Sequence, residues 1–205
     1  MKQAMQTVIF DMGGVLITFS QRQILEPWFE NEEELELVRQ VVFDSGDWLA
    51  LDHGTYSEAE VVARWVAAVP ETLRGRVEEM FSRWHETCKP IVGMPELIRD
   101  LKAAGYGCYL LSNTSPRFYV YRDEVEALRL LDGHFLSCEH RLSKPDPAIY
   151  LTMTERFGLD PTTCYFIDDT PHNVEGARSV GMDGWVFDGD VVALREDLRR
   201  AGFQF

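Results

Sequence analysis

Short, apolar, β-rich runs recur along the chain, and helix-like segments lie between them. Strands this short and this apolar are typical of a sheet that is buried on both faces. A regular succession of strand, helix and strand predicts right-handed βαβ units. The sequence therefore predicts an α/β fold with a doubly wound, Rossmann-like parallel sheet. The predicted strands are residues 7–10, 107–111, 134–137, 165–167 and 184–187.

Three of the intervening segments have recognisable helix ends. Residues 95–105 and 147–158 begin with proline and end with glycine, and residues 173–181 run from asparagine to glycine. Proline suits a first helical turn because its missing N–H would be unpaired there, and glycine suits the left-handed residue that follows a last turn. These ends predict helices between the strands.

Residues 18–89 interrupt the rhythm, because this stretch contains helical patterns and no convincing strand. A chain of 205 residues has room for one domain and a modest insertion. We therefore expect a discontinuous α/β core, formed by residues 1–17 and 90–205, with an all-helical insertion formed by residues 18–89.

The charge balance narrows the possible partners. The chain has 34 acidic and 20 basic residues and a net charge of −14, which argues against general binding to nucleic acid or to an anionic membrane surface. The apolar stretch near the start is too short for a signal peptide, and no run approaches the about 18 apolar residues that span a bilayer. The four cysteines form no CxxC pair, which favours reduced thiols. We expect a cytoplasmic protein.

Polar residues follow several of the predicted strands where each strand ends. Asp11 follows the first strand, residues 112–114 (Ser-Asn-Thr) follow the second, and residues 168–169 (Asp-Asp) follow the fourth. A loop further along carries Lys144. Ligands bind at the carboxyl ends of the strands in an open parallel sheet, so these groups are expected to converge there.

Three crowded carboxylates need a cation to stay ionised together. One divalent ion and Lys144 would bring the local charge close to zero, and oxygen ligands of this kind are what Mg²⁺ prefers. Such a site could hold a phosphoryl group between metal and lysine. The chemistry it favours is attack of a carboxylate on phosphorus, which forms an aspartyl phosphate that water later cleaves.

At these residues the chain resembles a hydrolase of the haloacid dehalogenase superfamily. The resemblance rests on four motifs that follow the family's order and spacing over about two thirds of the chain. It implies that the insertion is the family's small helical cap. The motifs are FDMGGVL at 10–16, LLSNT at 110–114, SKPDPAIY at 143–150 and FIDDTPHNVEGA at 166–177.

The resemblance also implies roles for individual residues. Asp11 would be the nucleophile and a metal ligand. Ser112 would hydrogen-bond the phosphoryl oxygens, and the Asn113 backbone would help to position them. Lys144 would balance the charge of nucleophile and phosphate. Asp169 would bind Mg²⁺ directly.

Two further roles complete the implied metal site. Asp168 would bind the metal or orient a water on it, and the backbone carbonyl of Gly13 would also reach the metal. Most phosphatases of the family carry an aspartate acid–base at the position of Gly13, and glycine cannot move a proton. General acid–base catalysis contributes about 10²–10⁴-fold to the rate, so the missing aspartate should have one of three consequences. Turnover is slower, or the cap supplies an acid, or the leaving group departs easily.

The glycine favours a substrate with an acidic leaving hydroxyl. Motif one also resembles that of a bacterial subgroup that includes α-D-glucose-1-phosphate phosphatases. We therefore expect a small phosphorylated metabolite as substrate, for which a hexose 1-phosphate is one hypothesis. Two alternatives stay open: a metal-free 2-haloacid dehalogenase, against which the acids at 168 and 169 count, and a non-catalytic protein that binds a phosphorylated metabolite. A monomer or weak homodimer is expected.

Several other residues have less certain roles. Asp52 and His53 lie beside a glycine turn, where either could face the pocket as a proton donor or lie in an exposed turn. Arg117 could clamp substrate or lie on the surface, and His172 is interpreted as a helix-start residue. Core packing is expected for the tryptophans of the insertion, which are Trp28, Trp48, Trp65 and Trp84.

Overall fold

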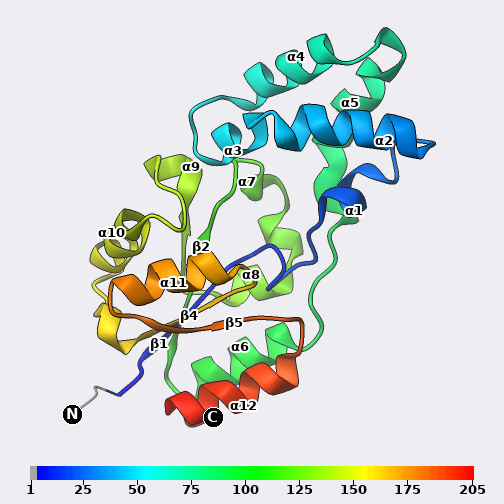
Figure 1. The fold of residues 1–205 in the computed structure, drawn as a ribbon. Coiled ribbons are helices and arrows are strands. Elements are labelled where there is room, and N and C mark those ends of the chain that lie inside the picture. Colours follow the sequence, from blue (N-terminus) through cyan, green and yellow to red (C-terminus); the bar gives the residue numbers. More distant parts are fainter. Residues whose placement is uncertain (1–3) are drawn as a thin grey trace.

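The computed structural model describes residues 4–205, and its centre is a five-stranded parallel sheet (Figure 1). The strand order is β3-β2-β1-β4-β5, so the order reverses beside β1. This confirms the doubly wound α/β class. Both ends of every predicted strand lie within one residue of the ends of the observed strand. The strands are β1 (Thr7–Phe10), β2 (Gly107–Ser112), β3 (Gly133–Leu136), β4 (Cys164–Asp168) and β5 (Asp183–Val186).

Helices cover both faces of the sheet. Helices α10 and α11 pack on one face, against an apolar cluster that includes Ile9, Leu111 and Phe166. Helices α6, α8 and α12 pack on the other face, where alternate residues of the same strands, such as Val8 and Leu110, lie in the larger core. The core helices are α6 (Met94–Ala103), α7 (Phe118–Tyr121), α8 (Glu126–Leu130), α9 (Ser137–His140), α10 (Pro147–Phe157), α11 (Pro171–Ser179) and α12 (Val191–Ala201), with the short turns η3 (Arg122–Glu124) and η4 (Pro161–Thr163).

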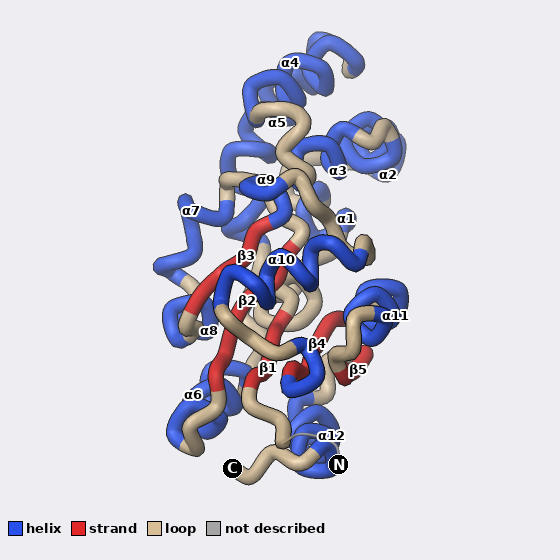
Figure 2. The backbone as a smooth tube through the Cα atoms, turned by 90° about the vertical axis from the view of Figure 1, so that its left-hand side faces the viewer, coloured by secondary structure: helices blue, strands red, loops and turns tan. Residues whose placement is uncertain are grey.

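The segment between β1 and α6 is helical and lies at one end of the molecule, beyond the carboxyl ends of the strands (Figures 1 and 2). Its buried side chains, such as Trp65 and Val77, join the larger apolar core. Its elements are α1 (Gln21–Leu25), α2 (Glu32–Arg39), η1 (Gln40–Asp44), α3 (Asp47–Asp52), α4 (Glu58–Ala68), α5 (Glu71–Arg83) and η2 (Trp84–Thr87). We call this segment the cap.

The chain enters and leaves the cap at adjacent points. Ile17 and Pro90 form an antiparallel bridge. On either side of it, the N–H of Thr18 donates to the Lys89 carbonyl at 2.7 Å and the N–H of Ile91 donates to the Leu16 carbonyl at 2.9 Å. These paired hydrogen bonds support the proposed division of the chain at residues 17–18 and 89–90.

Local chemistry explains the helix ends that the sequence predicts. Asp146 accepts a hydrogen bond from the N–H of Ala148 at the start of α10, and Gly158 ends that helix in the left-handed conformation. Helix α11 begins at Pro171, two residues before the predicted start. The short helices between residues 118 and 130 are not predicted, because fragments of four or five residues carry too little periodicity to be recognised.

Two expectations about the chain as a whole can be compared with the described residues. No helix within residues 4–205 combines the length and the apolar character needed to cross a membrane. All four cysteines are free thiols, and Cys108 and Cys164 are buried.

Candidate active site

Three neighbouring strands end in polar side chains that face one pocket. Strand β1 is followed by Asp11, β2 ends at Ser112, and β4 ends at Asp168, with Asp169 directly after it. Register brings these ends level, since Phe10 lies beside Leu110 on one side and beside Ile167 on the other. Asp11, Ser112 and Asp169 line a cavity of about 440 Å³ between the sheet and the cap.

Lys144 lies at the centre of the charged groups. Its Nζ contacts Asp11 Oδ1 at 2.7 Å and Asp168 Oδ2 at 2.6 Å, and its side chain is almost fully buried. Asn113 holds the backbone of Lys144 from both sides, because its Oδ1 accepts from the Lys144 N–H at 2.9 Å and its Nδ2 donates to the Lys144 carbonyl at 3.0 Å. The Asn113 side chain thus positions the lysine, a contact that the motif alone does not reveal.

Asp168 is a buried hub of hydrogen bonds. Its carboxylate accepts from the Thr170 N–H at 2.8 Å and from Asn173 Nδ2 at 2.9 and 3.0 Å, in addition to its ion pair with Lys144. Asn173 is a site residue that sequence reasoning missed. Its position in the first turn of α11, five residues after Asp168, was the signal available.

The three carboxylates form a group that can hold a cation. One oxygen from each of Asp11, Asp168 and Asp169 lies within 4.8 Å of the others. Mg²⁺ binds oxygen ligands at about 2.0–2.1 Å, so ligands on opposite sides of the ion are about 4 Å apart. Asp169 is exposed and can close the small remaining gap. This donor set fits a magnesium ion.

Electrostatics also favour a bound cation. Burial raises the pKa of Asp11 from 3.8 to about 7, against the opposing effect of Lys144 and with a further rise from the charge of Asp168. Burial and the charge of Asp168 raise the pKa of Asp169 as well. The pKa of Lys144 is raised, because the attraction of Asp11 and Asp168 outweighs its burial. A divalent cation would offset the two negative charges that remain after Lys144 is counted.

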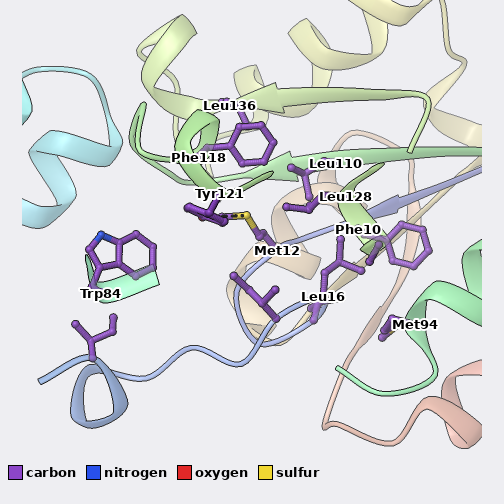
Figure 3. Packing of buried hydrophobic residues seen from close by; sticks show 14 of the residues in the cluster. Phe10, Met12, Leu16, Trp84, Met94, Leu110, Phe118, Tyr121, Leu128 and Leu136 are labelled. Atoms are coloured by element: carbon purple, nitrogen blue, oxygen red, sulfur yellow. Dashed lines mark hydrogen bonds between the residues drawn. The ribbon is translucent and has the colours of Figure 1, made fainter. Parts of the chain in front are cut away.

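The loop after Asp11 is held in place by the core. The Tyr121 hydroxyl contacts the sulfur of Met12 at 3.4 Å, and both side chains are buried (Figure 3). Gly13 lines the pocket, and a Cβ at this position would lie 3.2 Å from Phe19 Cβ. Gly14 has φ +76°, and a Cβ there would lie 2.2 Å from Asp169 Oδ2. Glycine at 14 is therefore needed for the close approach of the first and fourth motifs.

The cap supplies a largely aromatic wall opposite the charged groups. Trp48 and Trp84 both line the pocket, and their rings lie 5.5 Å apart in an edge-on arrangement. Both are also buried, as expected for core residues, whereas Trp65 is packed wholly within the core. The described cap residues on the wall are Phe19, Gln21, Phe43, Trp48, Leu49, Asp52 and Trp84.

A sequence profile of the haloacid dehalogenase-like hydrolases matches residues 5–181. The chain belongs to this family. It is accordingly a hydrolase. Four residues to which the motif resemblance gives roles all line the pocket between sheet and cap: Asp11, Ser112, Lys144 and Asp169.

Named relatives and a solved structure agree with the family. The chain is 44% identical over 206 residues to Phosphatase MT3486 of Mycobacterium tuberculosis (strain CDC 1551 / Oshkosh), with 90% of this chain and 88% of that protein covered. It is 30% identical over 156 residues to Flavin mononucleotide hydrolase 1 of Arabidopsis thaliana, with 76% of this chain covered but only 62% of the plant protein. The chain thus spans less than two thirds of the plant relative.

A structure of a haloacid dehalogenase family enzyme from Bacteroides thetaiotaomicron, in complex with magnesium and inorganic phosphate, has a similar fold. The TM-score is 0.76 at 21% sequence identity, and 93% of this chain and 99% of that chain are covered. At this identity the likeness establishes the fold.

The structure separates the residues whose roles the sequence left open. Asp52 lines the pocket, so the pocket-facing alternative holds for it. His53 does not, because its Nδ1 contacts Ser143 Oγ at 3.0 Å and so links cap to core. His172 lies exposed in the first turn of α11, as expected.

Arg117 is not among the residues that line the pocket, and its side chain does not project freely from the surface. Its Nη2 contacts Glu58 Oε2 at 2.7 Å, its Nη1 donates to the Ser82 carbonyl at 3.1 Å, and its guanidinium lies over the Phe81 ring. These partners belong to cap helices α4 and α5, while Arg117 follows β2 of the core. Arg117 therefore fastens the cap to the core.

Proposed function

We propose that this hydrolase is a magnesium-dependent phosphatase that cleaves a small phosphate monoester through an aspartyl phosphate. The observation that carries the proposal is Lys144, whose buried ammonium joins Asp11 to Asp168 beside a third carboxylate at the ends of three strands. This arrangement combines a nucleophile, a cation site and a fixed positive charge. The chemistry of phosphoryl transfer depends mainly on such positioning and electrostatic stabilisation.

In the proposed mechanism, Asp11 attacks phosphorus and forms the acyl phosphate, and water then cleaves it. Ser112 would hydrogen-bond the phosphoryl oxygens, and Lys144 would stabilise charge on both nucleophile and phosphate. Asp11, Asp169 and the Gly13 carbonyl would hold Mg²⁺, with Asp168 binding it or orienting its water. The ion would neutralise charge that develops on the transferring group.

The relatives support this assignment. One is named as a phosphatase and another as a flavin mononucleotide hydrolase, and a structure of similar fold contains magnesium and phosphate. A metal-free dehalogenase would have no need for the three clustered carboxylates. A non-catalytic binding protein is favoured only by Gly13, since every charged residue of the cluster is present.

The proposal is tested with a panel of phosphate monoesters. Activity is expected in the presence of Mg²⁺, loss of activity with EDTA, and recovery when Mg²⁺ is returned. Beryllofluoride should form an adduct on Asp11, and Asp11→Asn should abolish both the adduct and turnover. Activity towards 2-haloacids that survives EDTA would establish the dehalogenase instead, and a protein with neither turnover nor adduct would be a binding protein.

For the substrate we propose a small phosphorylated metabolite, with a hexose 1-phosphate as the specific hypothesis. Phe19 and Leu49 on the cap wall of the pocket are exposed, so they offer apolar surface on which the apolar face of a sugar can pack. The anomeric hydroxyl is a more acidic leaving group than an ordinary alcohol. Hexose 1-phosphates should therefore be cleaved faster than the matching 6-phosphates, and equal or reversed rates would remove this hypothesis without affecting the phosphatase assignment.

A further inference from the structure

Among the described residues 4–205, none on the core side of the pocket is an acid that is free to move a proton. Gly13 has no side chain, and the two pocket-lining carboxyls of the core, Asp11 and Asp169, are assigned to the nucleophile and the metal. Hydrolysis of an ordinary alkyl phosphate needs a proton for the departing oxygen and a base for the attacking water. A group on the opposite wall must supply both if such esters are cleaved.

Asp52 is the one titratable cap residue among the described residues that line this pocket. It is the last residue of α3, and the Trp48 indole and the backbone N–H of Ser115 lie near enough to its carboxyl to lower its pKa. It therefore reaches across from the cap to the residue that follows the Ser-Asn-Thr segment of the core. Because Asp52 lines the same pocket as Asp11 and Ser112, its carboxyl can face a bound substrate from the cap side.

The backbone around Asp52 is also fixed against the core. The Ser137 hydroxyl donates to the Asp52 carbonyl and accepts from the Thr114 N–H at 2.9 Å. Two residues later, a Cβ on Gly54 would lie 2.3 Å from the Cys138 carbonyl oxygen, so only glycine permits this approach. Figure 1 shows α3 over the end of β2 and next to α9. The position of Asp52 is thus set by contacts between cap and core.

The surroundings of Asp52 suit a group that holds a proton. Burial, together with the charge of Asp11, raises its pKa well above the ordinary value, against the opposing effect of its two hydrogen-bond donors. Both carboxyls line the same pocket, Asp52 from the cap and Asp11 from the core.

We propose that Asp52 is the acid–base residue of the phosphatase reaction and replaces from the cap the aspartate that is missing at position 13; this inference rests on the proposed function. In the first step, Asp11 forms a bond to phosphorus, the bond from phosphorus to the leaving oxygen breaks, and that oxygen takes the Asp52 proton. In the second step, water attacks phosphorus and gives its proton to the Asp52 carboxylate. The bond between Asp11 and phosphorus breaks, which releases phosphate and restores both residues.

The test compares esters that differ in their need for a proton. Asp52→Asn keeps the shape of the side chain and removes its acidity. We expect kcat/KM, which reports the first step, to fall by about 10²–10⁴-fold for an alkyl phosphate and far less for p-nitrophenyl phosphate, because nitrophenolate departs without protonation. The second step is common to both esters, so kcat alone does not separate them. The matched control is Asp47→Asn, because Asp47 lies in the same helix, is buried, and pairs with Arg64 at 2.9 Å outside this pocket. The control should affect both esters equally.

Each outcome decides the proposal. A loss of kcat/KM confined to alkyl esters supports it, whereas no loss of kcat/KM, or an equal loss for both esters, overturns it. A second measurement needs no variant: kcat/KM of the unsubstituted protein should fall little as the leaving alcohol becomes less acidic, and a steep fall would also overturn the proposal. If the unsubstituted protein shows no Mg²⁺-dependent hydrolysis of any ester, the proposed function fails; if it does and Asp52→Asn is unselective, only the role of Asp52 fails.

Discussion

The close approach of Gly14 to Asp169 allows this proposed metal ligand to be displaced without changing any charged residue. In Gly14→Ala, the new Cβ would lie 2.2 Å from Asp169 Oδ2 and 2.6 Å from its Cγ. Ordinary contact begins at about 3.4 Å, so the Asp169 oxygen must move by about 1.2 Å. Because Asp169 is exposed, its side chain can move towards solvent instead of disrupting the core.

The expected effects on stability and on metal binding differ in size. An L-residue in the left-handed conformation costs about 1–2 kcal/mol, which is the expected loss in the free energy of unfolding at φ +76°. A Mg²⁺ ligand must lie within about 2.0–2.1 Å of the ion, so a shift of this size removes Asp169 from the site. Losing even an outer partner of a metal ligand costs about 10–100-fold in affinity or activity, and we expect at least that loss of Mg²⁺ affinity here.

Gly158→Ala is the matched control. Gly158 also has a positive φ, +65°, but a Cβ there would point into open space, with no contact inside 4 Å. It ends α10 away from the pocket. The control should show the same backbone cost without any change in Mg²⁺ binding. Urea unfolding measures the first effect, and calorimetric titration with Mg²⁺ together with the Mg²⁺ dependence of kcat measures the second. Equal Mg²⁺ affinity in the two variants would refute the assignment of Asp169 as a ligand.

The charged cluster supports three other predictions. Lys144→Met leaves two buried carboxylates unpaired, so the free energy of unfolding should fall by about 3–5 kcal/mol without Mg²⁺ and by less with Mg²⁺. Urea unfolding with and without the ion measures this, and a loss of stability that Mg²⁺ does not reduce would contradict the prediction. Asn173→Ala removes both hydrogen bonds from Asn173 to Asp168, so Mg²⁺ affinity or kcat should fall by about 10–100-fold. If calorimetric titration and kinetics show both quantities unchanged, Asn173 does not have this role. The pKa of Asp11 is raised to about 7, and metal ligands must be deprotonated. Mg²⁺ affinity should therefore rise with pH through about 7, because binding displaces a proton from Asp11. Calorimetry that finds the same Mg²⁺ affinity across this pH range would exclude Asp11 as a ligand.

The cluster was largely predictable because its residues stand at strand ends. A change from an apolar run to Asp11, to Ser112 or to Asp168 is visible in the sequence, and parallel strands bring their carboxyl ends to one edge. The class of fold follows from the same local patterns. Lys144 was less directly predictable, because its loop does not end a strand but follows the short helix after β3.

The tertiary structure alone decided which segments that are distant along the chain contact one another. Only the folded chain reveals that Asn113 holds the Lys144 backbone, that Arg117 fastens the cap to the core, and that Asp52 reaches the pocket while its neighbour His53 contacts Ser143. The physical reason is that periodicity and helix-end chemistry act over a few residues, whereas the direction of a cap side chain depends on how two separately patterned units pack together.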